Sequence, residues 1–449
     1  MQFRALYDNN HTLWKSDEGS WAFFLDQESA GEVLELAAAE VRALRLDLSN
    51  NNGTVPTPPP APAVPPPDDD PVEELEAIGP PDPPPLSNFG ATYQRYTEMD
   101  NAARSGLLRE NTNRLEELTR EEHPDPDVVA EALVSASTDA TLTNRAAVNE
   151  AIRMGNEQAK AYTDEIVKET RLLVKSTTKL INAELFNEEL LNAVVEKSNG
   201  TVIQHMTRVF LSGLDFMLYY NRQVLTQGIA NHIRIKFPKK YKPFYQSILS
   251  HLHEDYVTLE RVFLGGMKAL DEAELNTYAT GFLVHDVGKA EDIEYHEGES
   301  AYDRDTVVRH VKIGYKAVME KTNYPREAAL ITGYHHEYYG DPAGYGYFRE
   351  FLDGYKRANP GATQDYVMSY TMEPLLDYEV LSYFPAKMLE IVDVFDSLTD
   401  RNRKYRKPLS TDEALEMIQR EFIEVHQKVD PILFDIFLDF VEYKKGRVV

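Results

Sequence analysis

The sequence predicts a mainly α protein, and three observations support this. Hydrophobic residues make up 42% of the 449 residues, which is enough for a sizeable core. Prolines are concentrated before residue 90, and after it apolar residues recur at helical spacing. A chain of this length favours two or three structural units. We expect four segments: a small N-terminal α/β or helical unit at 1–53, a linker at 54–88, a helical region at 89–186 and a large all-helical domain at 187–449.

The first two segments show no pattern typical of catalysis. Residues 1–53 combine a short apolar piece, Trp21 to Leu25, with an Ala/Leu/Glu-rich stretch that is predicted to be helical, Glu32 to Leu46. Residues 54–85 contain 14 of the 25 prolines and a run of three aspartates. Such a tract cannot form a packed core, so we interpret it as an extended, semi-rigid spacer. A ligand for SH3-like domains is the less common alternative.

Residues 143–186 contain no proline and are predicted to form one long helix. A series of apolar or small residues recurs along it at intervals of three, four or seven: Val148, Ile152, Gly155, Ala159, Tyr162, Ile166, Leu173 and Leu180. This spacing fits a heptad seam, although its small and polar residues make the seam weak. The helix either pairs with its twin in a homodimer or packs against the following domain. We also expect a fragment that begins near Thr143 to fold and to remain active.

The composition excludes several classes of function. The chain has no cysteine, so disulfides and thiolate chemistry are excluded, and any metal must be bound by His and carboxylate side chains. A net charge of -27 argues against general affinity for DNA, because that affinity depends on basic patches. The sequence shows neither a signal peptide nor an apolar run long enough to span a bilayer. We therefore expect a soluble, cytoplasmic protein.

Four of the twelve histidines form a spaced series with aspartates: His285-Asp286, His310, His335-His336 and Asp393. These residues end or interrupt apolar helical stretches. Neutral imidazoles and carboxylates suit iron, manganese or zinc, and a bridging aspartate permits two ions. On spacing alone, a coincidental set of core and surface residues is an equal alternative, since such clusters are common.

Four motifs in this part of the chain resemble the HD-GYP family of cyclic di-GMP phosphodiesterases and occur in the family's order. They are HDVGK at 285–289, HVKIGYKAV at 310–318, HHE at 335–337 and DVFDSLTDRNRKYRKPLS at 393–410. The resemblance covers about residues 190–440. It implies an all-helical HD-type phosphohydrolase domain that binds two divalent transition-metal ions, iron or manganese. The implied ligands are His285, Asp286, His310, His335, His336 and Asp393, with Asp286 as the bridge.

The family also uses a histidine on an earlier helix. QHMTRVFLSG at 204–213 fits that motif, which favours His205 and makes residues 222–270 an insertion. His253 lies nearer the family's usual separation, but its surroundings lack the Arg-Val pair, so it is the alternative. Members with a third metal have a glutamate four residues before this histidine. Thr201 stands there, or Leu249 if His253 is used, so the resemblance implies two metals.

The resemblance also assigns residues to the substrate. Lys289 would be catalytic together with Asp286, lying beside the metals and the substrate phosphate. Arg403, Tyr405 and Arg406 would bind the substrate, since guanidinium groups suit both phosphates and guanine edges. Ordinary surface positions are the alternative for Lys289 and the two arginines. Asp396, which follows the metal aspartate in the motif, is assigned a supporting role rather than ligation.

The loop after HHE departs from the family pattern. The family's D-G-x-G-Y-P is replaced by the seven residues from Gly340 to Gly346, so that glycine stands in place of proline. A long, Tyr-rich stretch follows up to Pro385 and suggests an added helix or lid. The resemblance implies a signal-transduction enzyme that hydrolyses cyclic di-GMP to pGpG and, in a second cleavage, to GMP. Two alternatives stay open: a non-catalytic cyclic di-GMP sensor, and an HD hydrolase of another nucleotide.

Overall fold

The computed structural model describes residues 3–5, 12–16, 21–24, 89–183, 202–249, 253–263, 267–290, 304–339, 344–347, 383–400 and 408–446. The chain divides into two units, Met1–Pro85 and Leu86–Val449. This division falls within the linker predicted at 54–88.

The described residues of the first unit are strands. β1 (Phe3–Ala5), β2 (Thr12–Ser16) and β3 (Trp21–Phe24) form an antiparallel sheet in sequence order. Phe3 pairs with Ser16, and Thr12 pairs with Phe24. The apolar piece that begins at Trp21 is therefore a strand, whereas the predicted helical stretch Glu32 to Leu46 lies outside the described residues.

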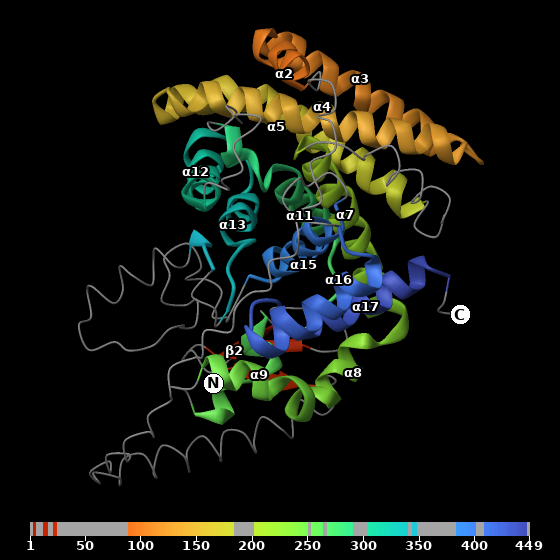
Figure 1. Ribbon diagram of the computed structural model, residues 1–449, viewed down its shortest axis with the longest axis vertical. Helices are drawn as coiled ribbons and strands as arrows, with labels where there is room; N and C mark the ends of the chain where they lie inside the picture. The colour runs from red at the N-terminus through yellow and green to blue at the C-terminus, as the bar shows by residue number, and fades with distance from the viewer. Residues whose placement is uncertain are drawn as a thin grey trace, which may run out of the picture. The chain divides into compact units, whose positions relative to one another are not determined.

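The second unit is built from helices, which confirms the prediction of a mainly α fold (Figure 1). Its described elements are α2 (Phe89–Glu98), α3 (Asn101–Arg120), α4 (Pro126–Ile152), α5 (Asn156–Ala183), α7 (Val202–Gln227), α8 (Ile229–Lys236), the π-helical turn η1 (Phe237–Tyr241), α9 (Lys242–Ile248), the short turn η2 (Glu254–Tyr256), α10 (Leu259–Val262), α11 (Glu272–Val284), the 3-10 turn η3 (Val287–Ala290), α12 (Arg304–Lys321), α13 (Arg326–Tyr334), α15 (Phe384–Thr399), α16 (Thr411–Met417), the π-helical segment η6 (Ile418–Val425) and α17 (Pro431–Lys444). Among these described helices, none combines the length and the hydrophobicity needed to cross a membrane.

The single helix predicted for 143–186 is wrong, because the chain breaks between α4 and α5 around Gly155. Glycine has low helix propensity but is tolerated at an N-cap, and the Gly155 carbonyl accepts the hydrogen bond of Ala159 N–H at 2.8 Å. α4 begins well before the predicted start, with Pro126 in its first turn and Asp125 as its N-cap. A fragment starting at Thr143 would therefore cut α4 in two.

Five of the eight residues of the predicted heptad seam are buried within their own chain. Val148, Ala159, Ile166, Leu173 and Leu180 are each at most 2% exposed. α4 packs against α7 and η3, and α5 packs against α11 and α12. The alternative in which this segment packs against the following domain is thus confirmed. The homodimer through 143–186 stays a prediction, since Ile152, Gly155 and Tyr162 of the seam are not buried. The boundary predicted between 186 and 187 falls inside one unit.

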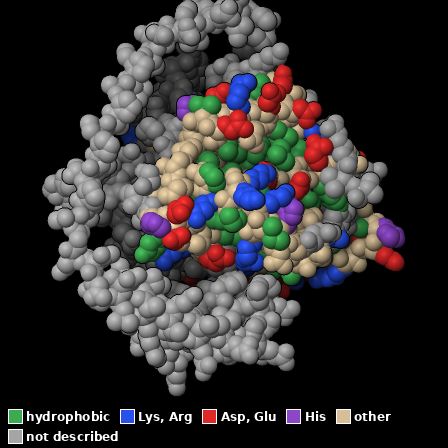
Figure 2. Space-filling view, turned by 90° about the horizontal axis from the view of Figure 1, so that it is seen from below, with side chains coloured by type: hydrophobic (Ala, Val, Ile, Leu, Met, Phe, Trp, Pro, Cys, Tyr) green, Lys and Arg blue, Asp and Glu red, His purple; other side chains and the backbone are tan. Residues whose placement is uncertain are grey.

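The predicted insertion at 222–270 contributes the short elements from α8 to α10. Residues 222–253 contain no acidic residue, yet cations here pair with acids elsewhere. Arg234 Nε lies 3.4 Å from Glu260 Oε1, and Lys240 forms an ion pair with Asp435 on α17. Seen from below, the described surface likewise shows Lys and Arg side chains among Asp and Glu (Figure 2).

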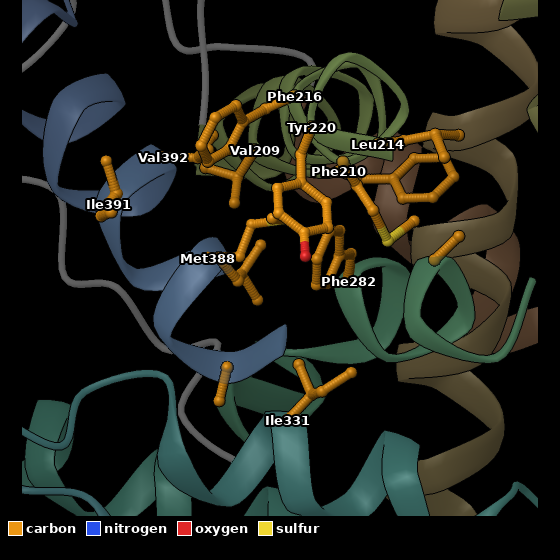
Figure 3. Close-up of a cluster of buried hydrophobic side chains, with 14 of the residues drawn as sticks. Val209, Phe210, Leu214, Phe216, Tyr220, Phe282, Ile331, Met388, Ile391 and Val392 are labelled. Atoms are coloured by element: carbon orange, nitrogen blue, oxygen red, sulfur yellow. The ribbon is translucent and has the colours of Figure 1, made fainter. Parts of the chain in front are cut away.

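A hydrophobic core joins the helices that carry the predicted motifs (Figure 3). α7, α11, α13 and α15 meet through side chains that are at most 1% exposed: Val209, Phe210, Leu214, Phe216, Tyr220, Phe282, Ile331, Met388, Ile391 and Val392. Burying one such large apolar side chain contributes about 1.5–3 kcal/mol. This core therefore fixes the ends of four helices relative to one another.

Candidate metal centre

Polar residues stand where these helices end or turn away from the core. α11 is followed directly by His285-Asp286, and α13 is followed by His335-His336. The remaining candidates lie within helices, with His205 on α7, His310 on α12 and Asp393 on α15. All seven predicted ligands are buried, at 0–6% exposure. Packing of the apolar helix faces thus brings these polar residues close together in the interior of the unit.

The ligand atoms of these residues form two groups that could each hold a metal ion. Asp286, His310, His335 and His336 make the first group, and His205, His285 and Asp393 make the second. Within each group the ligand atoms lie within 4.8 Å of one another. Asp286 Oδ1 is 3.0 Å from His310 Nε2, and Asp286 Oδ2 is 3.6 Å from His285 Nε2. Its carboxylate therefore lies between the two groups, where the predicted bridge would have to be.

Backbone carbonyls orient two of the imidazole rings. His285 Nδ1 lies 2.7 Å from the Phe282 oxygen, and His335 Nδ1 lies 2.8 Å from the Thr332 oxygen. A carbonyl can only accept, so each Nδ1 carries the hydrogen and each Nε2 offers a lone pair to the centre. Both Nε2 atoms are buried without a hydrogen-bond partner among the described residues. A metal ion would satisfy these atoms, which otherwise carry the cost of burial.

Asp396 holds His205 from behind. Its Oδ2 lies 2.6 Å from His205 Nδ1, while His205 Nε2 lies 3.0 Å from Asp393 Oδ1. Arg208 donates to Asp396 Oδ1 at 2.7 Å and pairs with Asp400 at 3.1 Å. Burial lowers the pKa of His205, but the hydrogen bonds with Asp393 and Asp396 outweigh it and raise this pKa to about 9. The contacts of Asp396 are those of a supporting residue, as its place in the motif implies.

The pKa shifts of His285, His336 and Asp286 favour the forms that bind a metal. Burial lowers the pKa of His285 to about 4, and burial together with His335 holds the pKa of His336 well below its usual range. Burial alone would raise the pKa of Asp286, but Lys289 and His285 hold it well below the ordinary value. Neutral imidazoles and ionised carboxylates are the forms that bind metals. This set of nitrogen and oxygen donors suits iron, manganese and zinc.

Lys289 reaches the rim of the centre from η3. Its Nζ donates to Asp286 Oδ2, and its side chain is 27% exposed. The ammonium group thus faces a carboxylate of the first group on one side and has access to solvent on the other. This is the place, beside the candidate metal ligands, that the motif implies for Lys289.

The structure does not bring every predicted site residue to the centre. His253 is exposed at 68% and caps the turn η2, so His205 and not His253 lies with the other ligands. Arg403, Tyr405 and Arg406 lie outside the described residues, as does most of the Tyr-rich stretch between Gly346 and Pro385.

A buried polar network behind the HHE loop was not foreseen. Lys387 on α15 is 2% exposed and donates to the Glu337 carbonyl and, at 2.8 Å, to Glu390 Oε2. Its Nζ lies 3.9 Å from the centre of the Tyr339 ring, whose hydroxyl donates to Asp430 at 2.9 Å. Lys387 and Glu390, two of the three charged residues in the otherwise apolar stretch FPAKMLEIVDVF, were the available signal. This network ties the loop that carries His335-His336 to the helix that carries Asp393.

The loop that departs from the family pattern lies against the ligands. Tyr345 N–H donates to the His336 carbonyl at 3.1 Å, and the two rings are 4.5 Å apart. Gly346 packs on Glu337, where a Cβ atom would collide with the carboxylate and lie 2.8 Å from Glu337 Cβ. Proline also has a Cβ, so this loop conformation excludes the family's proline unless Glu337 moves.

No family model matches the chain, and comparisons with curated proteins and with solved structures find no match either. The described geometry therefore defines the class of protein: an all-helical unit with a buried His/Asp centre that could hold a metal ion.

Proposed function

We propose that this chain is a metal-dependent phosphodiesterase of the HD-GYP type, which hydrolyses cyclic di-GMP in cytoplasmic signal transduction. One observation carries the proposal: the predicted ligands from all the separate motifs converge in two adjoining buried groups, with Asp286 between them. Seven buried candidate ligands from distant parts of the sequence thus form a donor set that could hold metal ions.

The proposed cofactor is a pair of divalent ions, iron or manganese. When bound, such ions lower the pKa of a coordinated water and neutralise charge on a phosphate. The chain's own residues would fix the geometry. Asp286 would contact both ions, and Asp396 would keep His205 Nε2 turned inward through the bond to Nδ1. Fixed ligands of this kind cost no reorganisation during the reaction.

Lys289 supplies the positive charge on the substrate side. Its partly exposed ammonium lies beside Asp286, where it would neutralise charge that builds on the non-bridging phosphate oxygens. Water would add to phosphorus while a ribose oxygen leaves, which opens the ring to pGpG. A second cleavage of the same kind gives GMP. The match of Arg403, Tyr405 and Arg406 to the family motif supports a guanine nucleotide.

The loop at Gly346 favours a second candidate. It replaces the family's Gly-Tyr-Pro and places Tyr345 against His336. A hydrolase of another nucleotide, such as guanosine tetraphosphate or a deoxynucleoside triphosphate, would keep the same metals behind a differently shaped entrance. A non-catalytic sensor of cyclic di-GMP is a third candidate function that is compatible with the same loop.

The test combines metal content with turnover. Protein purified without oxygen is analysed for metals and then incubated with Mn²⁺ or Fe²⁺ and cyclic di-GMP, guanosine tetraphosphate or deoxynucleoside triphosphates. We expect close to two ions per chain and conversion of cyclic di-GMP to pGpG. Metal content far below one ion per chain would refute the ligand assignment. Binding of cyclic di-GMP without turnover would identify the sensor, and turnover of another nucleotide alone would identify the second candidate.

His205 and His253 provide a matched pair of variants. His205→Ala removes a buried candidate ligand, whereas His253→Ala removes an exposed histidine of the same domain. We expect loss of metal and turnover only in His205→Ala.

A further inference from the structure

The turn that carries Lys289 rests on the helix of His310. Lys289 N–H donates to the Asp286 carbonyl at 3.0 Å, which closes the turn directly after the ligand. Gly288 packs so closely on α12 that a Cβ atom would collide with the His310 carbonyl and lie 2.6 Å from Gly314 N. The neighbouring atoms on this side are backbone, so they cannot give way as a flexible side chain would.

On its other side the turn is held by Arg145 of α4. Arg145 is 4% exposed, and its guanidinium donates to the Lys289 carbonyl at 2.6 Å. Such a bond is charge-assisted, and a guanidinium stays protonated at all relevant pH values. The two residues are 144 positions apart. The bond thus joins the helices upstream of α7 to the HDVGK motif.

α4 is itself fixed to the same helix that supports the turn. The Tyr324 hydroxyl, just beyond α12, donates to Asn144 at 2.5 Å, next to Arg145 in the sequence. Lys321, the last residue of α12, donates to the Met154 carbonyl at 2.6 Å. α12 therefore carries His310, supports Gly288 and anchors the helix that presents Arg145.

We propose that Arg145 is a positioning residue for Lys289. By holding the carbonyl of Lys289, it fixes η3 so that the ammonium stays beside Asp286 and the entering phosphate. Arg145 acts through Lys289 and contributes no metal ligand. The inference rests on the proposed function for its effect on turnover. It also makes α4 part of the catalytic unit, although α4 precedes the HD-type domain as the motifs delimit it.

A double-mutant cycle in the full chain tests this role. Arg145→Ala should leave the metal content unchanged and lower kcat by about 10–100-fold, the range found when an outer-shell partner of a site is lost. If Arg145 acts through Lys289, the double variant should be no slower than Lys289→Ala alone. Arg145→Lys keeps the charge and a donor and should recover part of the rate. Additive effects of the two alanine variants would overturn the proposal.

Arg104 of α3, which pairs with Glu150 of α4, provides a matched control. It is 0% exposed and pairs with Glu150 at 2.5 Å. If loss of any buried arginine merely loosened these helices, Arg104→Ala would lower kcat as Arg145→Ala does, and the proposal would fail. We expect Arg104→Ala to leave kcat per folded molecule unchanged.

Amide hydrogen exchange tests the same contact without turnover. Peptides that cover residues 285–290 should exchange faster in Arg145→Ala than in the wild type or in Arg104→Ala. Hydrogen exchange does not depend on turnover, so it tests the role of Arg145 even if the wild type hydrolyses no nucleotide. Failure of this role can therefore be distinguished from failure of the proposed phosphodiesterase function. If Arg145→Ala does not fold, Arg145→Lys and Arg145→Gln take its place. Unchanged exchange at 285–290 in the folded variants would overturn the role of Arg145.

Discussion

Two buried polar clusters of the second unit differ in how their groups are satisfied. Between α3, α4 and α5, Arg104 donates to Glu150 at 2.5 Å and to the Tyr162 hydroxyl at 3.1 Å. In the candidate metal centre, Nε2 of His285 and of His335 has no hydrogen-bond partner among the described residues. An unsatisfied buried polar group costs about 1–3 kcal/mol. The first cluster therefore stabilises the fold unaided, whereas the second has donor atoms that a cation would satisfy.

Burial and charge alone would not separate these two clusters. Arg104 is as deeply buried as His285, and both lie among helices. The difference is in their partners, since a guanidinium surrounded by acceptors needs nothing more. In a structural network the protein's own groups satisfy the buried polar atoms. A candidate site is distinguished by buried polar atoms that lack a hydrogen-bond partner.

The largest effect is expected for Asp286, whose carboxylate lies between the two groups of the candidate metal centre. Asp286→Ala should remove most metal binding and lower turnover at least about 1,000-fold, because several kcal/mol of transition-state stabilisation would be lost at about 1.4 kcal/mol per factor of ten. Elemental analysis and steady-state rates measure both. Wild-type metal content in Asp286→Ala would contradict the assignment of Asp286.

Glu150→Ala is the counterpart in the satisfied cluster. It leaves Arg104 without its carboxylate and should lower the free energy of unfolding by about 1–3 kcal/mol, since Glu150 is itself 40% exposed. Metal content and turnover per folded molecule should not change. If Glu150→Ala lost metal as Asp286→Ala does, the comparison between the clusters would fail.

The candidate centre could be predicted from the sequence because its residues stand in local patterns. Each histidine or aspartate of the motifs ends or interrupts an apolar stretch, and the apolar stretches are what bring them together. The resemblance also separated His205 from His253, since only His205 precedes an Arg-Val pair. Arg208 of that pair turned out to hold Asp396, which in turn holds His205.

Contacts between distant segments were not predictable in this way. The heptad seam indicated correctly that one face of 143–186 is buried, but a periodic pattern cannot say which surface covers it. Nor can it exclude a short break, which is why the interruption near Gly155 was missed. The hydrogen bond from Arg145 to the Lys289 carbonyl joins residues 144 positions apart, and no local sequence pattern indicates it. The helices upstream of α7 were therefore assigned to a separate segment.

Metal removal should affect the stability of the wild type and not that of Asp286→Ala. A ligand that binds only the folded state stabilises it by about 4 kcal/mol at a concentration near 1,000 times its Kd. We therefore expect a chelator to lower the Tm of the metal-loaded wild type and to leave Asp286→Ala unchanged. Thermal unfolding with and without chelator measures the difference. Equal shifts in both proteins would mean that the stabilising metal binds elsewhere.

The network behind the HHE loop adds a pH dependence to the comparison. Burial raises the pKa of Glu390 to about 8, although Lys387 opposes this. The Glu390 carboxyl therefore binds its proton more tightly in the folded state than in the unfolded state. The free energy of unfolding that this protonation contributes is lost as the pH rises toward 8. The loss should be on the order of 2–4 kcal/mol. Urea unfolding of metal-free protein from pH 5 to pH 8.5 should show this decline in the wild type and a flatter profile in Glu390→Gln. If the stability of the wild type and of Glu390→Gln declined in parallel with pH, another titrating group would be responsible.

An effect of the same size as that of Glu150→Ala is expected in the loop that packs against the ligands. Because a Cβ at position 346 would collide with Glu337, Gly346→Pro should displace the loop or the carboxylate and cost about 1–3 kcal/mol, the usual range for overpacking. Restoring the family's proline should thus change the rate or the ratio of pGpG to GMP instead of simply raising activity. Glu337→Ala in the same chain removes the colliding carboxylate but keeps Cβ, so the double variant should regain part of the stability lost in Gly346→Pro. Unfolding curves and product analysis of the three variants decide this. A Gly346→Pro variant with wild-type stability, rate and products would show that Glu337 yields freely, and that the glycine does not account for any difference in substrate between this chain and the HD-GYP enzymes it resembles.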